Sequence, residues 1–329
     1  MSAPIRDNDA AEPRDALERE LADLAQRLRS LHDGELAVFD ALALGSEAVP
    51  VLRELLFERD RAGIFEPRRR VVRALAALHA FGVLKEFIAG WRPAEDPVER
   101  LGDEAVVSAA AGELAVTGDE EAFAVLLGIA REHPIPGVVE AIGSYRRTEA
   151  IPVLIAALSD DCAGGPAQRA LEELGQDAVA ALVDAALVPL AGANGRETPS
   201  SIRRRRRALS ALVKTGARRA VQARLRPLVD DPDAEIAALA CRILLTSADE
   251  VWTCECVERL VELLRRATWP LRREVEDSLI ANGRVARAYV ERALRSAREE
   301  TSNDLERARF MGSLRRVLMT VRDGPDGSY

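Results

Sequence analysis

Apolar residues recur along most of this chain at intervals of three and four, which is the spacing of one face of an α-helix. In residues 14–31 the stripe consists of five leucines, Leu17, Leu21, Leu24, Leu28 and Leu31. Alanine, leucine and arginine, all good helix formers, dominate the sequence, and the β-branched alternation expected of strands is missing. The pattern predicts an all-α protein.

One helical phrase returns at a fixed interval of 28 residues. It reads AFAVLL at 122–127, AIPVLI at 150–155 and AVAALV at 178–183. Between the last two copies, residues 170–175 read as a second short helix that ends on Gly175. A fixed period of this size indicates a solenoid, in which no unit buries its own apolar face without its neighbours.

The same periodicity predicts helices in the rest of the chain. A phrase at 48–52, with Pro50 in its first turn, matches the one at 150–154. Ser200 or Ser201 is expected to cap a helix that runs to about Lys214, and Asp233 the helix at 233–245. The other predicted helices cover residues 14–31, 35–44, 67–80, 83–89, 103–116, 136–142, 218–229, 254–266, 270–281, 285–298 and 304–321.

These elements predict about nine stacked antiparallel helix pairs in an α-solenoid that covers residues 14–321. The array is most regular at 118–190, and turn-forming residues at 189–199 predict an inserted loop. Residues 1–13 are expected to be a disordered tail and residues 322–329 a flexible one. Residues 81–117 are less regular, with interruptions at 91–93 and at Asp96-Pro97, so a repeat and a linker both remain open there.

The repeated phrases resemble those of the HEAT family, and the short units are most similar to the bacterial HEAT-like repeats named from phycobilin lyases. The resemblance covers most of residues 45–321 and concerns the fold, because stacking imposes the same pattern on scaffolds, inhibitors and enzymes alike. It implies that the second helix of each pair lines a concave wall.

The composition of the chain argues against several classes of protein. The net charge is −8 and the isoelectric point is near 5.3, which argues against a general nucleic-acid coat. No apolar run reaches the length of a membrane span, and residues 1–14 do not resemble a signal peptide. The four cysteines form no CxxC pair and are expected to be buried, reduced thiols. We therefore expect a cytoplasmic protein.

The strongest charged feature is a basic segment, residues 198–229, with ten Lys or Arg residues and no Asp or Glu. On a helix, Arg203, Arg207 and Lys214 fall on one stripe, opposite the apolar face. Arg205 falls within the apolar face, so it must snorkel, pair or lie in a frayed first turn.

Second helices elsewhere in the array carry further arginines. If these helices line a concave wall, their guanidiniums suit a partner that bears carboxylates or phosphates, because arginine binds both bidentately. The alternative is that the charges are solvated or pair within the chain, for example with Asp177 and Asp184. The candidate partner-binding residues are Arg203, Arg204, Arg207, Lys214, Arg69, Arg73, Arg272 and Arg273.

Motifs for catalysis or metal binding are missing from the sequence. The three histidines lie in different predicted units, and no HExxH or His-Glu dipeptide occurs, which argues against the HEAT-repeat hydroxylases with their di-iron sites. No GxSxG, P-loop or GxGxxG occurs either. We therefore expect no metal, no cofactor and no catalytic residues.

These observations favour a non-catalytic interaction scaffold that binds an acidic or extended protein partner. One alternative is a DNA-binding protein that is similar to the HEAT-like alkylpurine glycosylases, with Trp91, Trp252 and Trp269 available beside basic helices. The other is a structural subunit of a larger assembly. The partner and the oligomeric state are open at this point.

Overall fold

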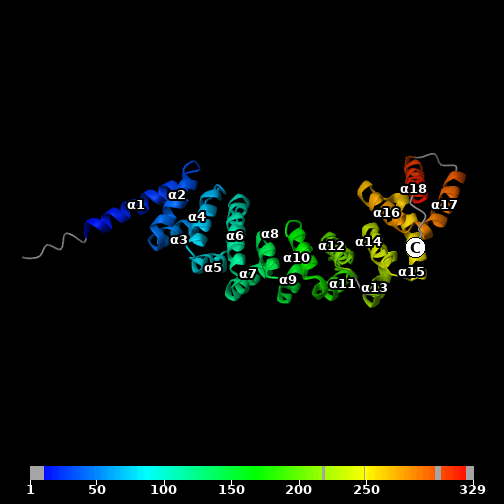
Figure 1. The fold of residues 1–329 in the computed structure, drawn as a ribbon, viewed down its shortest axis with the longest axis horizontal. Helices are drawn as coiled ribbons and strands as arrows, with labels where there is room; N and C mark the ends of the chain where they lie inside the picture. The colour runs from blue at the N-terminus through cyan, green and yellow to red at the C-terminus, as the bar shows by residue number, and fades with distance from the viewer. Residues whose placement is uncertain (1–10, 217–218, 248, 301–304, 324–329) are drawn as a thin grey trace, which may run out of the picture. The chain divides into compact units, whose positions relative to one another are not determined.

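The computed structural model describes residues 11–216, 219–247, 249–300 and 305–323, and these residues are helical apart from turns and loops (Figure 1). An isolated antiparallel bridge joins Ala191 to Glu197 inside the predicted loop. The chain divides into two compact units. Unit 1 contains the residues up to Ala157 together with Gly165–Ala170, and unit 2 contains Leu158–Gly164 and the residues from Leu171 onward.

Unit 1 consists of short helices joined by tight turns. Two of these turns are 3-10 helices, Gly45–Ala48 and Thr148–Ala150. The helices are α1 (Ala11–Arg29), α2 (Gly34–Leu44), α3 (Val49–Phe57), α4 (Glu66–Ala77), α5 (Phe81–Gly90), α6 (Pro97–Thr117), α7 (Glu120–Glu132), α8 (Pro136–Ser144) and α9 (Ile151–Ala157).

Unit 2 continues the same pattern, and α10 (Gly164–Leu174) contributes residues to both units. Its 3-10 helices are Gly175–Ala178 and Arg226–Asp230. The remaining helices are α11 (Val179–Leu187), α12 (Pro199–Thr215), α13 (Arg219–Leu225), α14 (Ala234–Leu244), α15 (Glu250–Arg266), α16 (Trp269–Ala281), α17 (Gly283–Glu299) and α18 (Leu305–Asp323).

Helices pack in two layers within each unit. In unit 1, α3, α5 and α7 follow one another in one layer, while α4, α6 and α8 stack in the other. In unit 2, α12 packs on α14 and α16 on α18, with α15 against α17. Because each helix pair buries its apolar face against the next pair, this is an all-α solenoid, as the 28-residue period predicts.

The repeated phrase supplies equivalent core positions. Its leading alanines, Ala122, Ala150 and Ala178, are all fully buried. The leucines four residues further on, Leu126, Leu154 and Leu182, are fully buried as well. A repeat of buried positions at this interval is the physical reason for the repeat in sequence.

Most helix boundaries agree with the sequence, and the differences have local causes. Asp233 caps α14 as expected, since its carboxylate accepts the N–H of Ile236. The cap of α12, however, is Thr198 rather than Ser200 or Ser201, because Pro199 fits the first turn, whose N–H has no partner within the helix.

Two further boundaries differ for a related reason. The Asp96-Pro97 dipeptide starts α6 rather than interrupting the array, and the Asp96 carboxylate accepts the N–H groups of Val98 and Glu99. The pair α5 and α6 therefore packs as a helix pair in residues 81–117. At the N-terminus, α1 begins at Ala11, inside the segment expected to be a tail. Residues 1–10 and 324–329 lie outside the described residues.

Candidate functional site

The basic stripe of α12 contacts the turn that precedes α10. The Arg203 Nε lies 3.0 Å from the carboxylate of Asp161. The Arg207 Nη1 donates to the carbonyl oxygen of Leu158 at 2.7 Å. These two guanidiniums stabilise a turn of the same unit, so part of their hydrogen-bonding capacity is used inside the chain.

The other two candidates on α12 also have partners within unit 2. Lys214 pairs with Glu172 at 2.8 Å. The Arg204 Nη2 donates to the carbonyl oxygen of Val188 at 2.6 Å, and burial lowers the pKa of this guanidinium. All four candidates on α12 thus have partners in the chain.

Arg205, which the sequence places on the apolar face, is buried and paired. Its Nε donates to the carbonyl oxygen of Ala186 at 2.8 Å, and its Nη1 lies 2.8 Å from the carboxylate of Glu197. Its Nη2 contacts the buried carboxylate of Asp231. Of the three possibilities that the sequence leaves open for Arg205, the structure shows pairing.

On α4, the two candidates lie on the exposed side. Arg69 is 3.3 Å from Glu66, one turn back, and Arg73 is 2.7 Å from Glu35 of α2. Both pairs are exposed, and exposed pairs contribute little to stability. Their guanidiniums are therefore easier for a partner to recruit than those of α12.

On α16, the two candidates have different environments. Arg272 is buried, and its Nη2 donates to the carbonyl oxygen of Ala267 at 2.9 Å. Arg273 is exposed and lies 5.9 Å from the centre of the Trp269 ring, which is itself 64% exposed. Of the two, Arg273 alone lies at the surface.

Three buried arginines share a role that sequence reasoning found only at Arg205. Each donates from a second helix to a carbonyl oxygen at the end of the preceding first helix. The pairs are Arg68 with Leu56, Arg205 with Ala186, and Arg272 with Ala267. The available signal is an arginine on the apolar face of a helix, where only an internally paired charge is stable.

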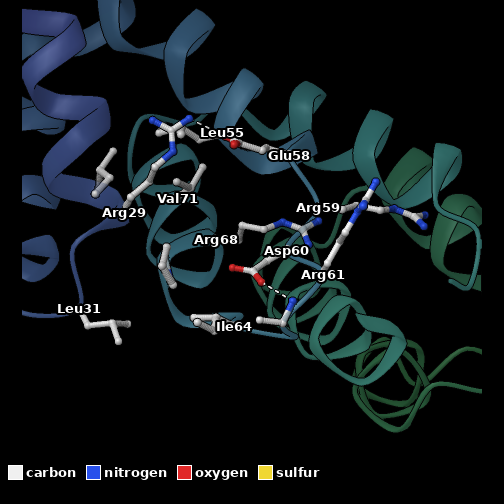
Figure 2. A pocket seen from close by; sticks show the side chains of 13 residues that line it. Arg29, Leu31, Leu55, Glu58, Arg59, Asp60, Arg61, Ile64, Arg68 and Val71 are labelled. Carbon is white, nitrogen blue, oxygen red and sulfur yellow. Dashed lines mark hydrogen bonds and ion pairs between the residues drawn. The ribbon is translucent and has the colours of Figure 1, made fainter. Parts of the chain in front are cut away.

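A cavity of about 520 Å³ lies in unit 1 below the loop at 58–65, and no sequence motif pointed to it (Figure 2). Its walls come from the end of α1, the end of α3, this loop and the start of α4. The loop lies directly on α6, because a Cβ at Gly63, whose φ is +73°, would be 2.6 Å from the carbonyl oxygen of Val98. The backbone contact fixes the wall of the cavity.

Salt bridges on two sides define the electrostatics of this cavity. Arg59 lies 3.2 Å from the buried carboxylate of Asp103, and Arg68 contacts the same carboxylate. On the other side, Arg29 pairs with Glu58 at 2.5 Å, and both side chains are exposed. Figure 2 shows Arg29 on one side of the cavity, and Arg59 and Arg68 on the other.

A groove of about 800 Å³ runs over α6 between α4 and α8. Small side chains, including Ala105, Ala109 and Gly112, form its floor. Phe65 and Arg69 line it on the α4 side, with the Arg69 guanidinium 5.8 Å from the centre of the Phe65 ring. This groove brings one candidate residue beside an apolar surface.

The side chains that could ligate a metal ion do not cluster in the described part of the chain. No group of three or more His, Cys, Asp or Glu side chains there is placed to hold a metal ion. His133 packs edge-on against Trp91 with 5.4 Å between ring centres. None of the helices in the described residues is long and apolar enough to cross a bilayer.

The cysteines are free, and they divide by burial. Cys241 and Cys256 are buried, as expected, whereas Cys162 is exposed and Cys254 lies at intermediate depth. The expectation of burial was therefore wrong for Cys162, because the turn that carries it lies at the surface. A hydrogen bond with Cys256 and burial both raise the pKa of the Cys241 thiol.

A scan against protein-family models finds no match, and neither does a comparison with curated proteins. Among solved structures, the chain is similar to the complex of CpcE and CpcF of phycocyanin lyase from Nostoc sp. PCC7120. The identity is 22%, the match covers 80% of this chain and 97% of that one, and the TM-score is 0.32.

A second similar structure is human deoxyhypusine hydroxylase in complex with glycerol. The identity is 18%, the match covers 85% of this chain and 98% of that one, and the TM-score is 0.30. With TM-scores below 0.5, the two matches carry no argument about the fold or the activity of this chain.

Proposed function

We propose that this chain is a non-catalytic interaction protein that binds an acidic amphipathic helix of a protein partner in the groove over α6. The observation that carries the proposal is the groove itself, about 800 Å³ between α4 and α8, with a floor of small side chains. Grooves between helices are a recurrent docking place for the apolar face of a partner helix.

The exposed face of α6 supports this proposal. Leu101 and Val116 are 69% and 86% exposed, and the small side chains of the groove floor lie between them along the helix. A floor of Ala and Gly lets a second helix approach closely, while larger side chains at either end of the face provide apolar contacts. Apolar surface of this kind is typical of an interaction site.

The charges on α4 favour an acidic partner. Arg69 lines the groove, and Arg73 lies one turn further along α4. Because their pairs with Glu66 and Glu35 are exposed, a partner carboxylate can replace either acid at little cost. The candidates on α12 would first have to leave their partners within unit 2, so we expect them to contribute less to binding than Arg69 and Arg73.

The experiment compares two matched glycine substitutions. Gly112 in α6 and Gly128 in α7 are both exposed, and a Cβ at either position meets no atom within 4 Å. We therefore expect both variants to fold normally. Gly112→Glu places a carboxylate in the groove, whereas Gly128→Glu places one on α7, in the other layer and outside the groove.

Affinity capture from lysate, read by quantitative mass spectrometry, gives the outcome. We expect a partner that wild type and Gly128→Glu retain and that Gly112→Glu loses, with retention that falls as salt rises. Equal recovery of every protein by all three variants would show that the groove is not the binding surface. A variant with Arg203, Arg207 and Lys214 changed to Glu tests the α12 stripe in the same way.

One observation favours a second candidate function, the binding of nucleic acid. The exposed Trp269 ring and the Arg273 guanidinium beside it are the side chains on which unpaired bases stack. Copurified nucleic acid that is lost with Trp269→Ala, but kept with Gly112→Glu, would favour this function over a protein partner.

A further inference from the structure

The cavity below the 58–65 loop has the composition of a small-molecule site. Its volume of about 520 Å³ falls within the range of about 300–1,000 Å³ that is common for ligand pockets. Leu28, Leu55 and Val71 give it an apolar lining from three helices, and all three are buried. A hydrocarbon group that enters the cavity therefore leaves water on several sides.

The mouth of the cavity keeps apolar side chains in contact with water. Leu31 and Ile64 line it and are 63% and 44% exposed. Figure 2 shows them below the polar residues, with Leu31 on the α1 side and Ile64 on the side of the loop. The chain itself leaves the side chains of Leu31 and Ile64 partly exposed to water, and an apolar ligand in the cavity would cover them.

The charges of the lining favour an anion. Arg59 and Arg68 are held by Asp103, and Arg29 by Glu58. Arg61 is exposed and has no acidic partner among the described residues.

Four arginines line the cavity, against two acids, Glu58 and Asp60. Asp60 is the remaining lining acid, and its carboxylate accepts the N–H of Ala62 at 2.7 Å, which holds it in the loop turn. Among the lining arginines, Arg61 is the one without an acidic partner in the described residues, and guanidinium binds carboxylate with two parallel hydrogen bonds.

We propose that this cavity binds a small amphipathic monocarboxylate. The hydrocarbon part lies on Leu28, Leu55 and Val71, and Arg61 closes over the carboxylate at the mouth. The site is independent of the proposed protein partner, because the cavity and the groove over α6 share no lining residue. An experiment can therefore disprove ligand binding in the cavity without disproving partner binding in the groove, and the reverse.

The test is a calorimetric titration of the full chain with octanoate, with octylammonium as a probe of the same length and opposite charge. We expect octanoate to bind the wild type and octylammonium to bind more weakly. Arg61→Gln should weaken octanoate binding at least about tenfold, because it removes a bidentate, charge-assisted contact. Leu31→Glu, at an exposed rim position, should weaken it as well.

The control is Arg131→Gln on α7, another exposed arginine, which does not line the cavity. It should bind octanoate as the wild type does. Three results would overturn the proposal: no heat with octanoate, tighter binding of octylammonium, or equal octanoate affinity in the wild type and Arg61→Gln. Circular dichroism of each variant verifies that the helices are intact.

Discussion

The guanidinium of Arg205 on α12 contacts the carboxylate of Asp231 at the turn before α14, and both side chains are buried. The same guanidinium also reaches Ala186 at the end of α11. One side chain on α12 thus reaches both the end of α11 and the turn before α14 in unit 2. A charge in this position stabilises the stack only while its partners remain, because an unpaired buried charge is costly.

We therefore expect Asp231→Asn to lower the free energy of unfolding by about 1–3 kcal/mol, since Arg205 loses its buried acid and keeps Glu197 as its remaining carboxylate. The matched control is Asp184→Asn, whose exposed pair with Arg224 at 2.7 Å should contribute less than about 1 kcal/mol. Urea unfolding followed by circular dichroism measures both. Similar losses in the two variants would mean that burial of the Arg205 pair does not matter.

The sequence predicted the fold because burial repeats in it. Ala150 and Leu154 lie in the core for the same reason as their counterparts 28 residues away, so periodicity alone was sufficient. The alternative of pairing within the chain holds for Arg224 and Asp184. Local chemistry, such as the cap at Asp233, was equally accessible.

The candidate sites were less accessible to sequence reasoning. Arg207 meets the carbonyl oxygen of Leu158, 49 residues earlier, and no local pattern encodes that contact. The cavity depends on a loop at 58–65 that has no periodicity, and on its contact with α6. The run of arginines therefore left a partner-binding surface and pairing within the chain both open, while the cavity left no recognisable motif.

Two glycines on neighbouring helices should respond to alanine in opposite directions. At Gly112 a Cβ meets nothing within 4 Å, so Gly112→Ala should raise stability by about 1 kcal/mol through helix propensity. At Gly137 a Cβ would lie 2.3 Å from the Cβ of Ser108, where α8 approaches α6. Gly137→Ala should therefore lower stability by about 1–3 kcal/mol through overpacking.

Thermal unfolding of the two alanine variants beside the wild type measures this difference. A gain in both would mean that α8 moves away from α6 at little cost. A loss in both would mean that the face of α6 around Gly112 is covered, which would also count against the groove as a docking site.

The thiols should differ in reactivity according to burial. The exposed Cys162 should react first with a maleimide, and the partly buried Cys254 more slowly. Burial and the hydrogen bond with Cys256 raise the pKa of Cys241, which disfavours its reactive thiolate, so Cys241 should remain unmodified in the native chain. Mass spectrometry after labelling, with and without urea, should show four sites only in urea. Rapid native labelling of Cys241 would contradict its burial.

The ion pair between Arg206 and Asp233 should make unit 2 sensitive to acid. Burial by itself raises the pKa of Asp233, but the hydrogen bonds from Arg206 and from the N–H of Ile236 outweigh it, so this pKa is lowered. A carboxyl group whose pKa is lower in the folded state stabilises the fold above its unfolded value of about 3.9. That contribution is lost as the pH falls through the lower, folded value.

Asp233→Asn isolates this effect, because asparagine caps a helix about as well as aspartate does. We expect the variant to be less stable than the wild type at about pH 7. The difference should begin to shrink below about pH 4, where Asp233 takes up a proton in the unfolded chain, and should vanish below the lower pKa of the folded state. Urea midpoints at several pH values measure the difference directly. Arg53→Gln, which removes an exposed pair with Glu86 at 2.5 Å in unit 1, shows how much acid sensitivity comes from surface pairs. A constant difference between wild type and Asp233→Asn at every pH would mean that the charge of Asp233 does not contribute.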